Sequence, residues 1–293
     1  MSATTIGIFL ALGALFSWGA GDFLIQQSSR KVGVNRTLFI NGIIGLIILT
    51  PFILRGDLSV FYNPKSLLIL AGTGLLMVIA ALVDFEALRE GKISVIEPVY
   101  ALELPLTVGL GIFLAGEHLG WGIYGLIGLI FIGTVMTGTV HKFQLHYHRR
   151  IFEKGVFLAI LAAVLMSFAN YYVAIGSRET SALLALWFVN AAIVVLCGII
   201  LLAKGDYKGM VKAVGKHKGV ALGQGVVDNL AWVFYASSMT FIPIGIATAI
   251  SESYIAIAAM LGLAVNKEKL KKHQFLGIVI TVGGIIFLAK LIE

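Results

Sequence analysis

The sequence predicts an all-α integral membrane protein in which ten transmembrane helices form two inverted five-helix repeats. Of its 293 residues, 59% are hydrophobic and only 13% are charged, whereas an ordinary soluble domain carries about 25% charged residues. The mean hydropathy of +0.97 excludes a soluble globular domain. Because a helix needs roughly 20 apolar residues to cross a bilayer, the chain has room for about ten spans and for no large water-soluble domain.

Ten apolar runs of spanning length occur along the chain, each bounded by charged residues, Gly or Pro. The runs are continuously apolar, and strands of a membrane barrel would instead alternate polar and apolar residues, so the runs predict helices. No Lys or Arg precedes the first run, which is therefore expected to stay as a helix and not to be cleaved as a signal peptide. The predicted spans are 5–26, 36–54, 65–88, 93–115, 120–140, 155–176, 180–203, 219–241, 243–265 and 274–292.

The basic residues predict how the chain is oriented in the cell membrane. Of the 22 Lys and Arg residues, 18 fall in the loops after the odd-numbered spans, so the positive-inside rule places these loops in the cytoplasm and both termini outside. These loops either set the topology alone or also contact anionic membrane lipids. A nucleic-acid partner is not expected, because the net charge of +7 is dispersed over short connectors and not collected on a folded, water-facing surface.

Two stretches of the chain repeat after 148 or 149 residues. GIFLALGALFSWGAGDF, from Gly7, resembles GVFLAILAAVLMSFANY, from Gly155, and FEALREGKI resembles FYASSMTFI further on. The same register places Glu103 opposite Glu252. The chain is thus predicted to consist of a first repeat at 1–140, a basic cytoplasmic linker at 141–154 and a second repeat at 155–293.

An odd number of spans in each repeat inverts the second copy in the membrane. The Lys and Arg bias of the loops changes sign between the copies, as inversion requires. Inverted repeats give secondary transporters two access states of similar energy around one site near the membrane midplane. A purely structural duplication is the alternative.

Several segments resemble a known family. The first half contains the segment WGAGDFL and, further on, FEALREGKISVIEPVYALELPLTVGLGIFLAGEHL. The second half contains FYASSMTFIPIGIATAISESYIAIAAMLGLAVNKEKL. Each long segment has an acidic residue near its end, Glu117 or Glu268, before a Gly-rich last helix. Over essentially its whole length the chain resembles the EamA-type permeases of the drug/metabolite transporter superfamily. This resemblance implies that helices 1 to 4 and 6 to 9 surround a central cavity, with helices 5 and 10 at the periphery.

Three acidic residues lie near the middle of predicted spans: Glu103, Asp228 and Glu252. An ionisable residue at the bilayer centre costs about 2.5 to 3.5 kcal/mol on insertion scales, and no Lys or Arg lies equally deep to neutralise these acids. They therefore either face a cavity or are protonated, hydrogen-bonded structural acids. Glu103 and Glu252, paired by the repeat, are the predicted proton-coupling residues.

Polar and aromatic side chains accompany these acids at helical spacing. Asp228 shares a face with Trp232, and an acid beside aromatic rings suits an ammonium group through charge and cation–π attraction, although packing alone would also explain the rings. Pro105 predicts a bend beside Glu103, since its ring removes a backbone hydrogen bond. The predicted substrate-binding residues are Trp18, Asp22, Tyr100, Glu103, Trp187, Asn190, Asp228, Trp232 and Glu252.

The sequence thus predicts a secondary active transporter of a small metabolite, working by alternating access. Deep acids without deep bases favour an amine or an amino acid, with proton coupling or exchange, over an anionic substrate. A channel and a proton-coupled exporter of lipophilic cations are the alternatives. An enzyme is not expected, because no nucleophile motif or metal set is found, and the linker residues His141, His146 and His148 lack a further ligand. No cofactor is predicted.

Overall fold

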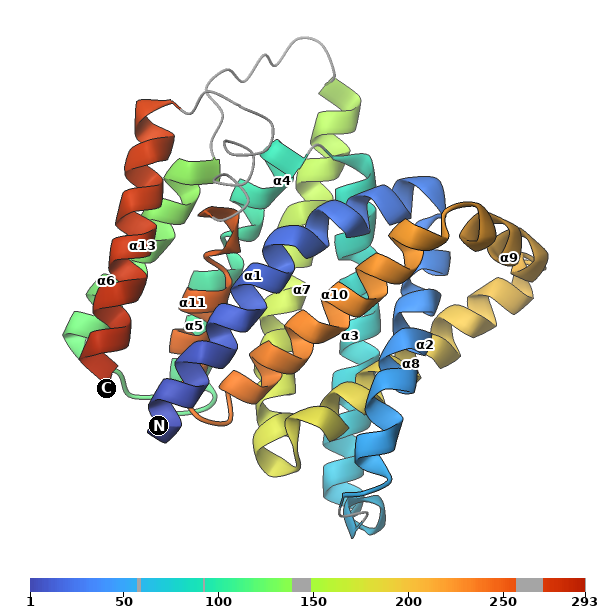
Figure 1. Ribbon diagram of the computed structural model, residues 1–293, viewed down its shortest axis with the longest axis horizontal. Helices are drawn as coiled ribbons and strands as arrows, with labels where there is room; N and C mark the ends of the chain where they lie inside the picture. The colour runs from blue at the N-terminus through green and yellow to red at the C-terminus, as the bar shows by residue number, and fades with distance from the viewer. Residues whose placement is uncertain (57–58, 92, 139–148, 257–270, 293) are drawn as a thin grey trace.

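A computed structural model describes residues 1–56, 59–91, 93–138, 149–256 and 271–292, and every element in these ranges is helical (Figure 1). The predicted all-helical fold is therefore confirmed for the described residues. Most of the predicted linker, with its three histidines, lies outside them, as does Glu268.

The first half contains five long helical segments. Ser2 caps the first helix by accepting a hydrogen bond from the amide of Thr5, and Asn63 caps the third in the same way, with Pro64 in its first turn. The elements are α1 (Ala3–Lys31), α2 (Val34–Ile53), a short 3₁₀ helix η1 (Ser59–Tyr62), α3 (Pro64–Glu90), α4 (Ile93–Tyr100), α5 (Glu103–Phe113) and α6 (Trp121–Gly138).

The second half repeats this order with the chain direction reversed. In Figure 1, α1 begins at the end of the molecule where both termini lie, whereas the first helix of the second half ends there. An additional short helix lies between its second and third long helices. The elements are α7 (Arg149–Glu179), α8 (Ala182–Ala203), α9 (Tyr207–Lys216), α10 (Lys218–Ser238), α11 (Ile244–Ser251) and α13 (Lys272–Ile292).

Eight described segments are long and apolar enough to cross a membrane, which makes the chain a multi-pass membrane protein. The predicted eighth and ninth spans are not among them. The eighth corresponds to α10, whose mean hydropathy is lowered by Gln224, Asp228 and Asn229. The ninth is described only as far as residue 256, and its described part, Ile244–Ala256, is shorter than a full span.

The fourth helix of each half is interrupted, and the two breaks lie within two residues of each other in the repeat register. In the first half, the chain turns at residues 101–102 and α5 begins at Glu103; in the second, α11 ends at Ser251 and the chain turns at 252–253. The expected bend is thus a break that lies just before Pro105. The carbonyl of Ala101 there accepts a hydrogen bond from the amide of Leu104.

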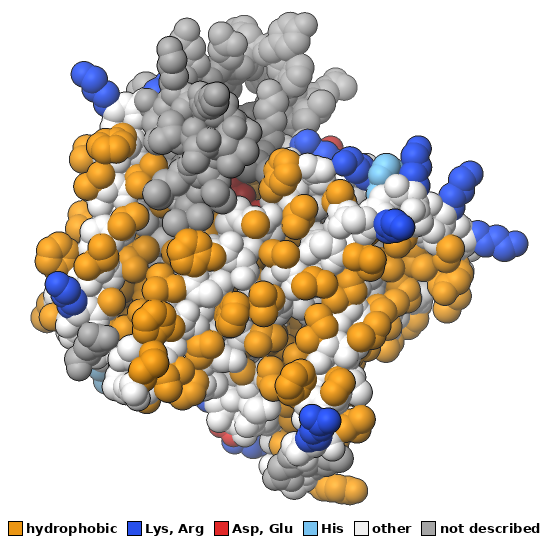
Figure 2. Space-filling model, viewed as in Figure 1, with side chains coloured by type: hydrophobic (Ala, Val, Ile, Leu, Met, Phe, Trp, Pro, Cys, Tyr) orange, Lys and Arg blue, Asp and Glu red, His pale blue; other side chains and the backbone are white. Residues whose placement is uncertain are grey.

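The two halves pack as equivalent partners. Helix α1 packs along α10 and α3 along α7, which are equivalent pairs when the halves are exchanged, while α2 packs along α8 and α6 along α13. Hydrophobic side chains cover the visible sides of the molecule, and most Lys and Arg side chains lie toward its ends (Figure 2).

Two glycines let α6 and α13 approach each other closely. A methyl group at Gly133 would lie 2.9 Å from the carbonyl oxygen of Gly277 and from the amide of Thr281. A methyl group at Gly277 would lie 2.7 Å from the carbonyl oxygen of Gly133 and from the amide of Thr137. Helices in membranes use small residues in this way to bring their backbones together.

We therefore expect Gly133→Val and Gly277→Ala to force α6 and α13 apart and to destabilise the protein by about 1 to 3 kcal/mol, the usual cost of overpacking. Thermal unfolding in detergent measures the effect. Gly128→Ala and Gly283→Ala are the controls, because a methyl group at either position meets open space. Equal unfolding temperatures in all four variants would contradict this account of the contact.

Candidate functional site

A cavity lies between the two halves, and five carboxyl groups line it. Glu103, Asp228 and Glu252 are only 8%, 4% and 6% exposed, and Asp22 and Asp84 lie with them in the cavity wall. Among the described residues that line this cavity there is no Lys, Arg or His. Its wall is therefore rich in acidic groups and lacks a basic side chain in the described part of the chain.

The two interrupted helices are linked beside the cavity. Tyr254, just after the break in the second half, donates a 2.7 Å hydrogen bond to Oε2 of Glu97 in α4. Asp22 and Tyr254 both line the cavity. This hydrogen bond therefore connects the first half of the chain to the second next to the cavity.

A chain of amide side chains orients Asp228. Asn41 of α2 donates to Oδ2 of Asp228 at 2.8 Å, Asn229 donates to Oδ1 of Asn41 at 3.0 Å, and Asn190 donates to Oδ1 of Asn229 at 3.0 Å. The chain crosses from one half to the other. Gly45 is required beside it, because a methyl group there would collide with Asn190 and Asn229.

Aromatic rings gather around Trp18. Trp232 stands nearly perpendicular to it, with ring centroids 5.4 Å apart and an interplanar angle of 84°, and Tyr254 lies at 6.5 Å. These three rings line the cavity. Tyr235 packs behind them, 5.2 Å from Trp18, and shares a 2.7 Å hydrogen bond with Thr248. Aromatic faces next to carboxylates can attract a cation.

One polar group of the cavity wall has no partner. Asn170 of α7 is only 2% exposed and lines the cavity. Its side-chain nitrogen makes no hydrogen bond with any described residue. A buried donor left unpaired costs about 1 to 3 kcal/mol, so a hydrogen-bond acceptor in the cavity would stabilise it.

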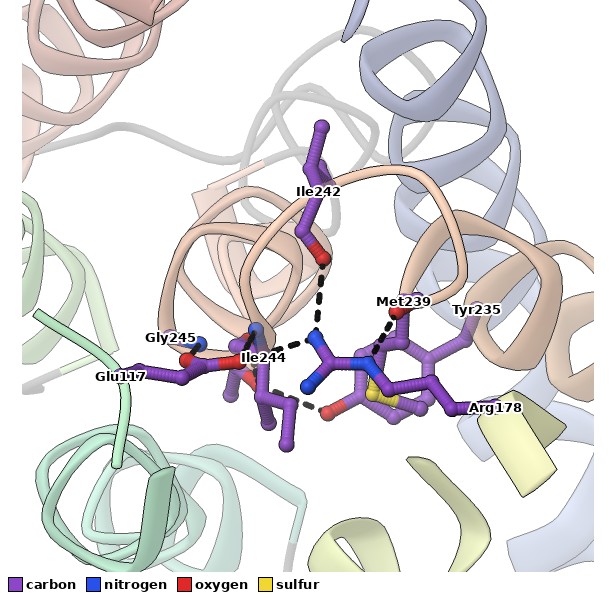
Figure 3. A network of polar contacts seen from close by, with 8 residues as sticks. Glu117, Arg178, Tyr235, Met239, Ile242, Ile244 and Gly245 are labelled. Atoms are coloured by element: carbon purple, nitrogen blue, oxygen red, sulfur yellow. Dashed lines mark hydrogen bonds and ion pairs between the residues drawn. The ribbon is translucent and has the colours of Figure 1, made fainter. Parts of the chain in front are cut away.

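An ion pair joins the halves at the end of α7 (Figure 3), which lies at the end of the molecule that carries both termini (Figure 1). Glu117, which follows α5, accepts a 2.8 Å hydrogen bond from Arg178 of α7. The same carboxylate accepts hydrogen bonds from the amides of Ile244 and Gly245, at 2.8 Å and 3.3 Å. It thereby caps α11, where the helix dipole favours a negative charge.

Arg178 also holds the segment that joins α10 to α11, donating to the carbonyl oxygens of Met239 and Ile242 at 2.8 Å and 3.3 Å (Figure 3). Its counterpart in the repeat is Arg30. Arg30 donates to the carbonyl oxygens of Arg89 and Gly91, between α3 and α4, at 3.1 Å and 2.6 Å. Equivalent arginines therefore clamp equivalent segments at opposite ends of the molecule.

Comparison with known proteins identifies the family. The model of the EamA-like transporter family matches residues 5–139 and again residues 153–290. The chain belongs to the EamA-like transporter family. The sequence resemblance is thereby confirmed.

The other comparisons concern the fold of this EamA-like transporter. A solved structure entitled "Crystal structure of protein" covers 99% of the chain over 97% of its own length, with a TM-score of 0.73 and 20% identity. At this identity the similarity shows a common fold only. No curated protein among those compared matches the chain.

Among the described residues, no three His, Cys, Asp or Glu side chains form a set that could hold a metal ion.

The structure brings together all but one of the residues predicted for substrate binding. The exception is Trp187, whose indole nitrogen donates to Thr50 at 3.0 Å and whose ring packs against Phe61 and Phe188, away from the cavity. The other residues of the predicted set line the cavity: Trp18, Asp22, Tyr100, Glu103, Asn190, Asp228, Trp232 and Glu252.

Sequence reasoning passed over several residues of this site. Asn41 is opposite Asn190 in the repeat register, a signal that was present in the sequence. Asn229 and Tyr254 gave no comparable signal, because each is a single polar residue next to a predicted site residue. Asp84 also lines the cavity, and its carbonyl oxygen accepts a 3.1 Å hydrogen bond from Tyr100.

Proposed function

We propose that this EamA-like transporter carries a small amine or amino acid by its ammonium group, in exchange for protons, through alternating access. The observation that carries the proposal is the cavity with five carboxyl groups and, among its described lining residues, no basic one. An anionic substrate would call for Arg or Lys in this wall. A positively charged group is instead attracted there.

The ammonium site of the proposal lies between Asp228 and the rings of Trp18 and Trp232. Asn41 fixes one oxygen of Asp228, and the perpendicular rings offer π faces beside it. The unpaired nitrogen of Asn170 favours a substrate that also carries a hydrogen-bond acceptor. Among molecules that carry an ammonium group, this supports an amino acid or an amino alcohol over a simple alkylamine.

Proton coupling is assigned to Glu103 and Glu252, because each lies at the break in its helix. Interrupted helices at equivalent positions of inverted repeats commonly form the binding site of secondary transporters. Glu103 begins α5, and Glu252 directly follows α11. Movement at the breaks would therefore change the surroundings of both carboxyl groups together.

Two other functions remain as alternatives to this proposal. An exporter of lipophilic cations would use the same acids and aromatic walls, but it gives the unpaired Asn170 no role. A channel would conduct without saturation, so saturable counterflow distinguishes a carrier from it.

The ion pair of Glu117 and Arg178 is proposed to close the extracytoplasmic side. It joins α5 of the first half to α7 and α11 of the second half. The two halves cannot separate at that end while it is intact. Opening toward the outside therefore requires that this ion pair break. Arg30 lies at the opposite end, and in the described part of the chain it holds only residues of its own half.

We expect Asp228→Asn and Glu103→Gln to separate binding from coupling. A thermal-shift screen of amines and amino acids first identifies a ligand of the wild-type protein. Asp228→Asn should weaken its binding about 10- to 100-fold, since a hydrogen bond to a charged group is worth about 1.5 to 3 kcal/mol. Glu103→Gln should retain binding but lose pH-driven flux in proteoliposomes.

Glu179→Gln, an acid outside the cavity lining, is the control and should leave both measurements unchanged. A flux driven by a pH gradient that persists in Glu103→Gln would refute the coupling role. Unchanged ligand affinity in Asp228→Asn would refute the ammonium site.

Loss of the ion pair should expose the cavity to the outside. In a Cys197→Ala background, Met166→Cys places a thiol in the cavity wall. Adding Glu117→Gln or Arg178→Gln should raise its rate of labelling by a membrane-impermeant maleimide from outside about tenfold. In the wild-type protein the outward-open state must break this ion pair, and in the variants it no longer has to. A gain of about 1.4 kcal/mol for the outward-open state corresponds to a factor of ten in its population.

Asp206→Asn is the matched control, because Asp206 also pairs with an arginine of the other half, Arg36, near the opposite end. It should not raise external labelling, because loss of a contact between the halves at that end favours opening on the other side. Equal labelling rates with and without the Glu117–Arg178 pair would show that the pair supports the fold without controlling access.

A further inference from the structure

The short helix α9 has an amphipathic face that the other described residues leave uncovered. Met210 is buried against the molecule, whereas the neighbouring apolar residues Tyr207 and Val211 are 53% and 56% exposed. Lys208 and Lys212 are exposed as well. The helix therefore presents both apolar and basic side chains to its surroundings.

These side chains occupy separate sectors of α9. At about 100° per residue, the apolar Met210, Val214, Tyr207 and Val211 fall within an arc of about 100°. Lys208, Lys212 and Lys216 fall within an arc of about 80° on the opposite side. None of these three lysines has an ion-pair partner among the described residues. Such a division suits a helix lying in a membrane interface, with apolar side chains toward the acyl chains and lysines toward head groups.

The orientation of α9 is fixed by a contact between the halves. Asp206, immediately before the helix, accepts a 2.7 Å hydrogen bond from Nε of Arg36, at the start of α2. The Arg36 guanidinium holds the pKa of Asp206 below its ordinary value, so this pair stays charged at neutral pH. Figure 2 shows Lys and Arg side chains gathered over this edge of the molecule, above the hydrophobic surface.

We propose that α9 is an interfacial helix that binds the head groups of acidic phospholipids through Lys208, Lys212 and Lys216. Tyr207 and Val211 enter the boundary of the acyl chains beside them. Charge complementarity identifies the occupant, because this surface lies in the predicted cytoplasmic loop with the most basic residues and so faces the leaflet surface that carries acidic lipids. Helix α9 connects α8 to α10, so lipid binding would fix the ends of two helices that contribute Asn190 and Asp228 to the cavity.

Two measurements on the full-length protein test this inference. The first is native mass spectrometry of protein extracted from vesicles of phosphatidylcholine mixed with phosphatidylglycerol, which counts the lipids retained. A lysine near an acidic surface contributes about 1 kcal/mol, or roughly fivefold in binding. Lys208→Gln/Lys212→Gln/Lys216→Gln should therefore lower the retained ratio of phosphatidylglycerol to phosphatidylcholine at least fivefold. Arg55→Gln/Lys65→Gln/Lys290→Gln, which removes three exposed charges elsewhere, should lower it much less.

The second measurement places a spin label at Val211→Cys or at Lys216→Cys in a Cys197→Ala background. In vesicles containing phosphatidylglycerol, the label at 211 should be accessible to oxygen in the bilayer, and the label at 216 to a water-soluble nickel complex. A label at 211 that faces water would overturn the proposal. So would an equal loss of phosphatidylglycerol in the two triple variants, which would show a general charge effect. Neither measurement depends on the substrate or on the proton coupling proposed above.

Discussion

The constraint on which this structure depends is the cost of placing carboxyl groups inside a membrane. Each such group must face water, a cation or a hydrogen-bond donor. The cavity satisfies this requirement for Asp22, Asp84, Glu103, Asp228 and Glu252 together. Amide side chains, aromatic rings and two helix breaks are arranged around these acids. The features of the site therefore follow from the requirement that each carboxyl group inside the membrane have water, a cation or a hydrogen-bond donor beside it.

The repeat explains both the symmetry of the site and its departures from symmetry. Asn41 and Asn190 are equivalent, as are Glu103 and Glu252, and both pairs line the cavity. Asp22, however, is equivalent to Asn170, so one half offers an acid where the other offers an unpaired donor. A site built in this way can hold a substrate whose two ends differ in charge, while two similar halves retain access states of comparable energy.

The sequence predicted the all-helical architecture and named four of the five acids that line the cavity, because long apolar runs and deep charges are determined by the bilayer itself. It could not place Trp187, since one helical turn separates it from Asn190 and a small rotation decides which side chain faces the cavity. The break at residues 101–102 was predicted as a bend only. Tyr254 and Glu97 meet across 157 residues, a contact that no local pattern encodes, and α9 was expected as a basic loop.

Proton release on ligand binding tests the central claim most directly. A cationic ligand added to unbuffered, purified protein with a pH indicator should displace protons from the acid-lined cavity, and the release should saturate with the binding curve. The account predicts that the release falls when Glu103 is replaced by Gln. Saturable binding of a cation without any proton release would contradict the exchange of substrate and protons at these carboxyl groups.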